Sequence, residues 1–367
     1  TPPKIEAYKY LTYAKSNYDN EDLYLELLNK AIESDSNYIE AKILKVGHYY
    51  NLGEFKEADS LRKAILPNSR ISERQRNLLN FNEAMFTGKN DKIYSTILNE
   101  YKIAKVDLQT NSTAMVIGLQ YVNKPEDMEE IFNEISMEDM VLENCTHCGF
   151  RYFINALAQI ELKNYDKAIS DLLPITNEIE DPYLKKPLIT AYIRSNRKQE
   201  LESLLDKIEL KLTDNDWVEL NLYAGREYLL INEIESANSY FDIVIKSYTN
   251  AEPDDMLGMA YFYKQDYENA MLVFKELYQN KGYNNLFKVI AKLAILHHIN
   301  SNVSEAEKLI SSLDELRDEF QFGKIDYRIA QYHATINNKE LALDYLKRSI
   351  AAGNIYTSIT FQNDPIF

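Results

Sequence analysis

The chain has 367 residues and is unusually poor in glycine and proline, with 10 and 9 copies. Apolar residues make up 45% and charged residues 27%, values that exclude a wholly disordered chain. The net charge of −16 argues against general binding to nucleic acid or to anionic membrane surfaces. No stretch approaches the roughly 18 consecutive apolar residues of a membrane helix. Because turn-forming residues are so scarce, we expect an all-α chain.

The predicted elements recur along the chain at intervals of about 34 residues, each as a pair of helices. The first helix of a pair carries a small residue, and the second carries an early small or apolar anchor followed by a large one. In chain order, the anchors of the second helices are Tyr24, Ala58, Ile93, Met128, Ala168, Leu201, Ala237, Ala270, Ala306 and Ala342. This spacing predicts about ten helical hairpins.

The two clearest copies lie side by side at 221–250 and 254–283. The first has Gly225, then Ala237 and Phe241; the second has Gly258, then Ala270 and Phe274. A small residue on each helix lets the two backbones approach, while the aromatic rings fill the space on either side. We therefore expect the aromatic residues of these copies to be core residues.

At these residues the chain resembles the tetratricopeptide repeat (TPR) family. The resemblance implies an α-α superhelical solenoid over 1–367, with weaker repeats in 1–140 and clearer ones in 150–352. The segment 141–149, at the one long interval, is expected to be an inserted loop. The tail 353–367 is expected to fold back as a cap.

Shorter motifs resemble the TPR regions of bacterial signalling proteins that carry winged-helix regulators, serine/threonine kinases or nucleotide cyclases. The motifs are Glu6-Ala7-Tyr8, 71–76 and Phe361-Gln362-Asn363-Asp364-Pro365. This resemblance implies that the chain is a regulatory arm whose effector domain is absent. The missing initiator Met is consistent with such a piece.

Cys145 and Cys148, with His147 between them, are the most suggestive short motif. Two thiolates can bind zinc, but a closed site needs four ligands, and no second pair of cysteines exists. Structural thiols, a local disulfide and a metal or redox site all remain open, and the first is favoured. We expect no bound metal, with Cys145 and Cys148 as weak candidates.

Other polar clusters have ordinary structural interpretations. His297 takes the position of a core aromatic residue, so we expect it to be buried. The acidic run 126–143 is expected to be a solvated surface, with docking of a basic partner as the alternative. No phosphate-binding loop or catalytic motif is found, so we expect neither an enzyme nor a cofactor.

In the TPR family the first helices line a concave groove that binds peptides. Lys288 and Lys292, and likewise Lys324 and Arg328, are spaced i, i+4, so each pair presents two cations on one face. The second pair resembles half of the carboxylate clamp of chaperone-binding repeats. The resemblance implies a groove lined by Arg226, Met259, Phe262, Tyr263, Lys288, Lys292, His298, Lys324, Tyr327, Arg328 and Gln331.

The predicted function is a non-enzymatic scaffold or sensor module that binds a protein or peptide in this groove. The positive groove favours an acidic peptide or a C-terminal carboxylate, and neither nucleic acid nor membrane insertion is expected. A regulatory arm of a larger signalling protein is the first alternative. A small-molecule or metal binder at the segment around Cys145 and Cys148 is the second. The compartment is left open by the sequence.

Overall fold

The computed structural model describes residues 2–65, 71–136, 142, 145–177, 179, 181–209, 214–249, 251–280 and 286–367. Helices and turns make up this described part of the chain, which contains no strand. The predicted all-α class is therefore confirmed. The chain divides into two compact units. Unit 1 comprises Thr1–Val122 and Asp127–Arg151, and unit 2 comprises Asn123–Glu126 and Tyr152–Phe367.

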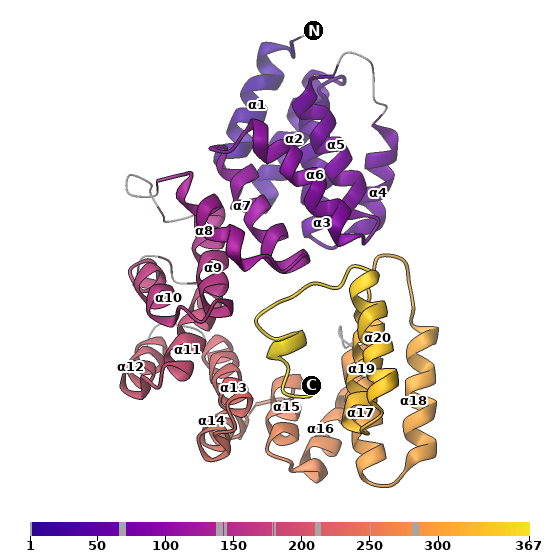
Figure 1. The fold of residues 1–367 in the computed structure, drawn as a ribbon. Coiled ribbons are helices and arrows are strands. Elements are labelled where there is room, and N and C mark those ends of the chain that lie inside the picture. The colour runs from indigo at the N-terminus through magenta and orange to yellow at the C-terminus, as the bar shows by residue number, and fades with distance from the viewer. Residues whose placement is uncertain are drawn as a thin grey trace. The chain divides into compact units, whose positions relative to one another are not determined.

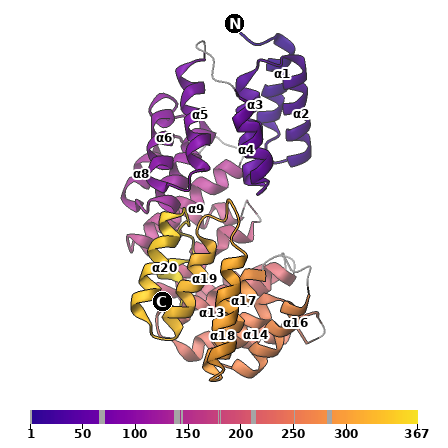
Figure 2. The same cartoon turned by 90° about the vertical axis from the view of Figure 1, so that its right-hand side faces the viewer.

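Unit 1 is built from helices that pair in chain order, α1 with α2, α3 with α4 and α5 with α6 (Figure 2). Polar side chains begin several of them: Asn20 caps α2, and Ser72 and Gln75 form a capping box on α5. The elements are α1 (Ile5–Ser16), α2 (Glu21–Ser34), α3 (Ile39–Asn51), α4 (Phe55–Ala64), α5 (Glu73–Met85), α6 (Asn90–Ile103), α7 (Leu108–Val116), the π-helical turn η1 (Ile117–Tyr121) and α8 (Pro125–Asn133).

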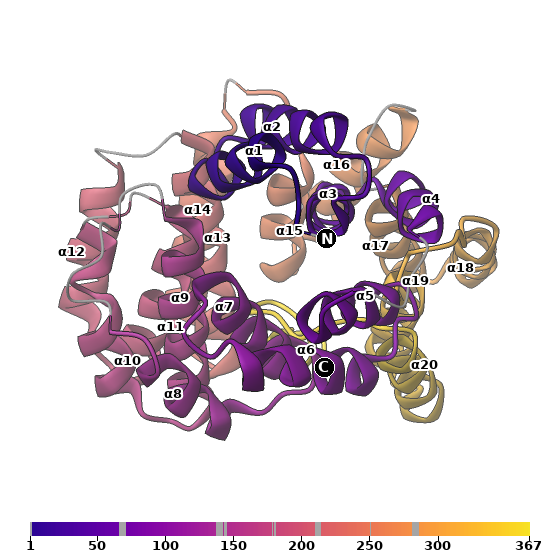
Figure 3. The same ribbon diagram turned by 90° about the horizontal axis from the view of Figure 1, so that it is seen from above.

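Unit 2 continues the same pairing. Its helices are α9 (Thr146–Glu161, whose first residues belong to unit 1), α10 (Tyr165–Leu172), α11 (Lys185–Arg194), α12 (Lys198–Glu209), α13 (Asp214–Leu230), α14 (Ile234–Ser247), α15 (Asp255–Tyr263), α16 (Tyr267–Gln279), α17 (Leu286–Ile299), α18 (Val303–Glu315), α19 (Lys324–Thr335) and α20 (Lys339–Ala351), with 3₁₀ turns at Ile175–Asn177, Pro182–Leu184 and Phe361–Asn363. In Figure 3 the first helices α11, α13, α15 and α17 line the inside of a curve, and their partners lie outside.

The predicted repeat frame is confirmed throughout the array. All ten predicted anchors lie on the second helices of the pairs, from α2 to α20, and every one of them is buried. The array is thus a succession of TPR-type helical hairpins. Its stability comes mainly from contacts between neighbouring hairpins.

The close approach of the two helices in a hairpin explains the small residues of the repeat. A Cβ atom added to Gly225 would lie 2.4 Å from the Phe241 ring, and one added to Gly258 would lie 2.7 Å from the Phe274 ring. Ala237 and Ala270 are fully buried at the same crossings. The predicted roles of these small and aromatic residues are confirmed.

The turns between paired helices explain why so little glycine is needed. In unit 2 each tight turn has one non-glycine residue in the left-handed region, with φ between 58° and 63°. Asparagine tolerates this conformation better than most residues do. These turn residues are Lys163, Asn196, Asn232, Gln265, Ser301 and Asn337.

One predicted boundary differs from the structure. The sequence predicts an inserted loop over 141–149, whereas α9 already begins at Thr146. Within that predicted loop, residues 141, 143 and 144 lie outside the described part of the chain. The single solenoid over 1–367 remains a prediction.

Candidate functional site

The tail segment, residues 354–367, crosses the inner face of unit 2. It leaves α20 and returns toward α15 and α13 (Figure 1). The Tyr356 hydroxyl donates to Glu161 Oε1 on α9 at 2.5 Å. Further along, Arg226 Nη2 on α13 donates to the backbone oxygens of Ile359 at 3.0 Å and Asn363 at 3.2 Å. The tail is therefore held by helices from several hairpins.

Asp364 makes a buried contact of the tail segment and is only 4% exposed. Its Oδ2 accepts from the Tyr327 hydroxyl at 2.9 Å and from Gln331 Nε2 at 2.5 Å, both on α19. The same Tyr327 hydroxyl accepts from the Phe361 backbone N–H at 3.0 Å. The Tyr327 ring also meets the Phe361 ring edge to face, with centroids 5.5 Å apart. Tyr327 thus contacts both the carboxylate of Asp364 and the ring of Phe361.

Positive charge surrounds this carboxylate. Arg226, Lys292 and Arg328 all interact electrostatically with Asp364. Lys292 is buried, and its Nζ lies 4.7 Å from the centroid of the Phe262 ring. Burial lowers the pKa of Lys292 to about 7, although Asp364 acts in the opposite direction. Desolvation therefore outweighs the attraction of one carboxylate at this position.

The structure brings many of the predicted groove residues together. Arg226, Tyr327 and Gln331 bond to the tail directly. Arg328 Nη1 donates to Gln331 Oε1 at 2.8 Å and so supports the residue that binds Asp364. These residues come from α13 and α19, as the TPR resemblance implies.

The predicted apolar anchors lie beneath the cations instead of forming an open surface. Phe262 and Tyr263 are each 8% exposed. The Arg226 guanidinium lies 5.8 Å from the Tyr263 ring centroid. Met259 packs against the core of unit 2. Packing within unit 2 accounts for all three side chains.

Three predicted residues lie away from the described tail contacts. Lys288 is half-buried, and its pKa is lowered by burial and by Arg328. Lys324, at the start of α19, is exposed. His298 Nδ1 lies 3.3 Å from the Tyr332 hydroxyl, with which it shares a hydrogen bond.

Sequence reasoning missed the partners that complete this face. Glu227 on α13 is buried and pairs with Arg194 on α11, with 3.0 Å between Nη2 and Oε2. Burial raises the pKa of Glu227, and Arg194 opposes the change. Arg194 also donates to Asn363 Oδ1 at 3.4 Å. The sequence offers no signal that singles out this pair, because α13 carries other charged residues as well.

Cys145 and Cys148 are joined by a disulfide, with their Cα atoms 5.2 Å apart. This is one of the three alternatives that the sequence leaves open, though not the favoured one. In this oxidised form neither sulfur offers a thiolate to a metal ion. Within the described residues, no group of three or more His, Cys, Asp and Glu side chains is arranged to hold a metal.

Two other predictions concern His297 and the acidic run 126–143. His297 is only half-buried where a core position was expected, and its Nδ1 lies 3.3 Å from Asn302 Nδ2 at the hairpin turn. In the acidic run, Glu134 pairs with Lys105 at 2.7 Å. Its members Glu138, Asp139 and Glu143 lie outside the described part of the chain.

None of the described helices combines the length and the apolar character needed to cross a lipid bilayer. No family model matches the chain, and no curated protein matches its sequence.

Three solved structures are similar to the chain. A crystal structure of the APC/C hetero-tetramer Cut9–Hcn1 has 13% identity and a TM-score of 0.35, and the match covers 100% of this chain and 76% of that one. For the TPR domain of P58(IPK) the identity is 14% and the TM-score 0.23, and the match covers 94% of this chain and 99% of that one. For Naa15/Naa10 bound to HypK-THB the identity is 14% and the TM-score 0.25, and the match covers 93% of this chain and 62% of that one. Since these TM-scores are low, the TPR assignment rests on the hairpins themselves.

Proposed function

We propose that the chain is a non-enzymatic protein-interaction scaffold, and that the inner face of unit 2 binds an acidic, aromatic segment of a partner protein. The observation that supports this is the tail segment, which already lies on that face and bonds to it as a bound peptide would. Its recognition elements are the carboxylate of Asp364 and the ring of Phe361.

The chemistry of the face favours such a ligand. Tyr327 and Gln331 donate to a carboxylate, and the nearby Arg226 and Arg328 add positive charge in a chain of net charge −16. Hydrogen bonds to a charged group contribute about 1.5–3 kcal/mol each when buried. A side-chain carboxylate is the acidic group that fits this arrangement, so we favour an acidic segment over a C-terminal carboxylate.

A partner segment and the tail segment would compete for the same donors. Partner binding then requires release of the tail, and the observed affinity falls by the fraction of molecules whose tail is released. The regulatory arm of a larger signalling protein, expected from the resemblance, stays a prediction beside this proposal.

The test uses the full chain and a dye-labelled synthetic peptide with the sequence of residues 355–367. Asp364→Asn in the protein weakens the hold on its own tail, so we expect it to bind the peptide about tenfold more tightly than wild type does. Arg226→Ala, added to Asp364→Asn, should reduce that affinity about tenfold or more, as loss of a charged anchor does. Fluorescence anisotropy measures both.

Lys324→Ala is the matched control, because it removes an exposed positive charge from α19 away from the tail contacts. It should change the affinity less than twofold. A peptide that carries Asn in place of Asp364 should bind weakly, and the affinity of the acidic peptide should fall as salt rises. Equal binding of the Asp and Asn peptides would contradict the proposal.

A further inference from the structure

We infer that unit 1 contains a second, separate binding site, for a small uncharged aromatic ligand. A cavity of about 580 Å³ lies among α3, α5, α7, η1 and the first turn of α9. Pockets for small organic ligands usually have 300–1,000 Å³. Every residue that lines the cavity belongs to unit 1. The site is therefore independent of the inner face of unit 2.

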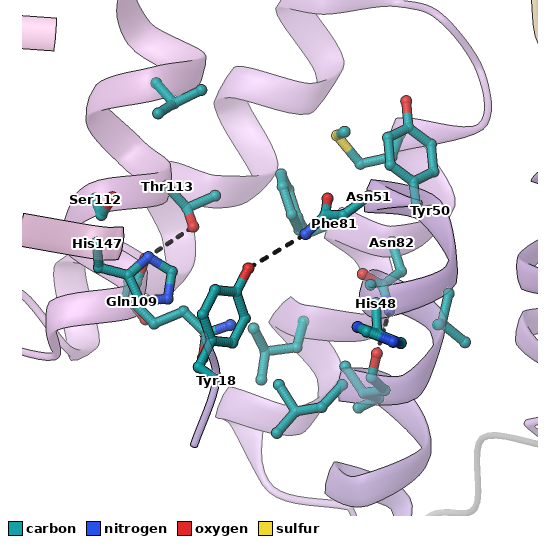
Figure 4. Close-up of a pocket in the computed structure, with 18 of the residues that line it drawn as sticks. Tyr18, His48, Tyr50, Asn51, Phe81, Asn82, Gln109, Ser112, Thr113 and His147 are labelled. Carbon is teal, nitrogen blue, oxygen red and sulfur yellow. Dashed lines mark hydrogen bonds between the residues drawn. The ribbon is translucent and has the colours of Figure 1, made fainter. Parts of the chain in front are cut away.

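Aromatic faces make up much of the wall. The Tyr18 and His147 rings lie against one another at a tilt, with centroids 4.6 Å apart and planes at 30°. Tyr24 and His48 approach to 5.3 Å. Figure 4 shows His147 and Gln109 on one side of the space and His48 on the other. Flat apolar surfaces of this kind suit a planar ring.

The two cations at the cavity, Lys15 and Arg74, are paired with carboxylates, and the carboxylates of Asp19 and Glu21 lie at its exposed rim. Lys15 pairs with Glu40 at 2.8 Å, and Arg74 Nε pairs with Glu100 at 2.6 Å. Asp19 also accepts from the Thr146 hydroxyl. A charged group inside the pocket would have to displace one of these pairs or remain unpaired, which is costly.

Neutral hydrogen-bonding groups remain available. Among the described residues, no partner accepts from or donates to the side chains of Gln109, His48 and His147. Burial lowers the pKa of both imidazoles and so favours their neutral form, in which each ring has one hydrogen-bond donor and one acceptor. An uncharged ring with a polar substituent complements this set.

Gly47 adds to the open space of the cavity. It lies inside α3, where glycine is less favourable than alanine. Its backbone does not have a positive φ, and a Cβ atom added to it would meet nothing within 4 Å. Neither a special backbone conformation nor close helix packing explains this glycine. What it does is keep space open at the cavity that it lines.

The opposite wall includes the π-helical turn η1, which contributes Ile117, Gln120 and Tyr121. Single π-helical turns inside helices are rare and frequently occur at functional sites. The first turn of α9, closed by the Cys145–Cys148 disulfide, contributes Thr146 and His147. The site therefore makes the small-molecule alternative of the sequence analysis specific: Thr146 and His147, which lie between the two cysteines, line the cavity, whereas the cysteines themselves do not.

The test compares three probes that share an indole ring and differ in charge. N-acetyl-tryptophanamide is neutral, N-acetyl-tryptophan is an anion and tryptamine is a cation. With the full chain at pH 7.5, we expect calorimetry to show binding of the neutral probe at least tenfold tighter than that of either charged one. In NMR spectra, the imidazole C–H signals of His48 and His147 should shift with the neutral probe.

Gly47→Leu places a side chain in the open space and should weaken binding of the neutral probe at least tenfold. Gly47→Ala, the matched control, adds one carbon and should change it less than threefold. Both variants should bind the 355–367 peptide as wild type does, so failure here is distinguishable from failure of the peptide proposal. Absence of binding by all three probes, stronger binding of a charged one, or full binding by Gly47→Leu would overturn the inference.

Discussion

Lys292 shows how a single side chain couples the tail to the stability of unit 2. Its Nζ is buried over the Phe262 ring without a hydrogen bond to any described residue. The nearest compensation is the electrostatic attraction of Asp364. An exposed lysine keeps a pKa near 10.4, so burial makes the protonated form of Lys292 unfavourable in the folded protein.

This lysine predicts a pH dependence of stability. Its pKa is about 7 when folded and near 10.4 when unfolded, so the unfolded chain binds more protons between these values. The free energy of unfolding therefore rises with pH from about 7, by at most about 1.4 kcal/mol per pH unit. Lys292→Met should remove this rise. Urea unfolding of unit 2 at pH 7, 8 and 9 measures this rise in the wild type and in Lys292→Met. If the free energy of unfolding increased equally with pH in both proteins, the prediction would be contradicted.

At the scale of the helical element, the closest contact in a hairpin fixes which residue the repeat requires. Gly258→Ala brings a Cβ atom within 2.7 Å of the Phe274 ring, which is itself buried in the core. We expect a loss of about 1–3 kcal/mol in the free energy of unfolding, as for other overpacked cores. Thermal or urea unfolding measures the loss.

Gly47→Ala is the control for this prediction, because the same change in helix α3 meets open space. It should raise the stability of unit 1 by up to about 1 kcal/mol through helix propensity alone. Two glycine-to-alanine changes inside helices should therefore have opposite signs. A loss of stability at both positions would mean that propensity and packing have been assigned wrongly.

At the scale of the whole molecule, stability in an array is a sum of local terms. Ala270→Leu overpacks the α15–α16 hairpin, where Ala270 is fully buried. Hydrogen exchange should then accelerate in α13–α18 and remain unchanged in α1–α6, which belong to unit 1. Mass spectrometry of exchanged peptides measures this, and uniform acceleration over both units would contradict it.

The sequence by itself determined the class of the fold and the frame of the repeat. The anchors from Tyr24 to Ala342 are all buried on second helices, because each hairpin buries the same position where its two helices pack together. It also indicated Arg226, Tyr327 and Gln331 as residues of the inner face. Such features depend on residues close in the chain, so their periodic pattern reveals them.

Only the tertiary structure decided what these residues contact. Asp364 meets Tyr327 and Gln331 from more than thirty positions away, and Tyr356 meets Glu161 across nearly two hundred. The cavity of unit 1 likewise joins Gly47 to His147. No local period links such pairs, because the path of the whole chain sets which distant segments meet. The tail's position on the inner face and the open space beside Gly47 follow from that path alone.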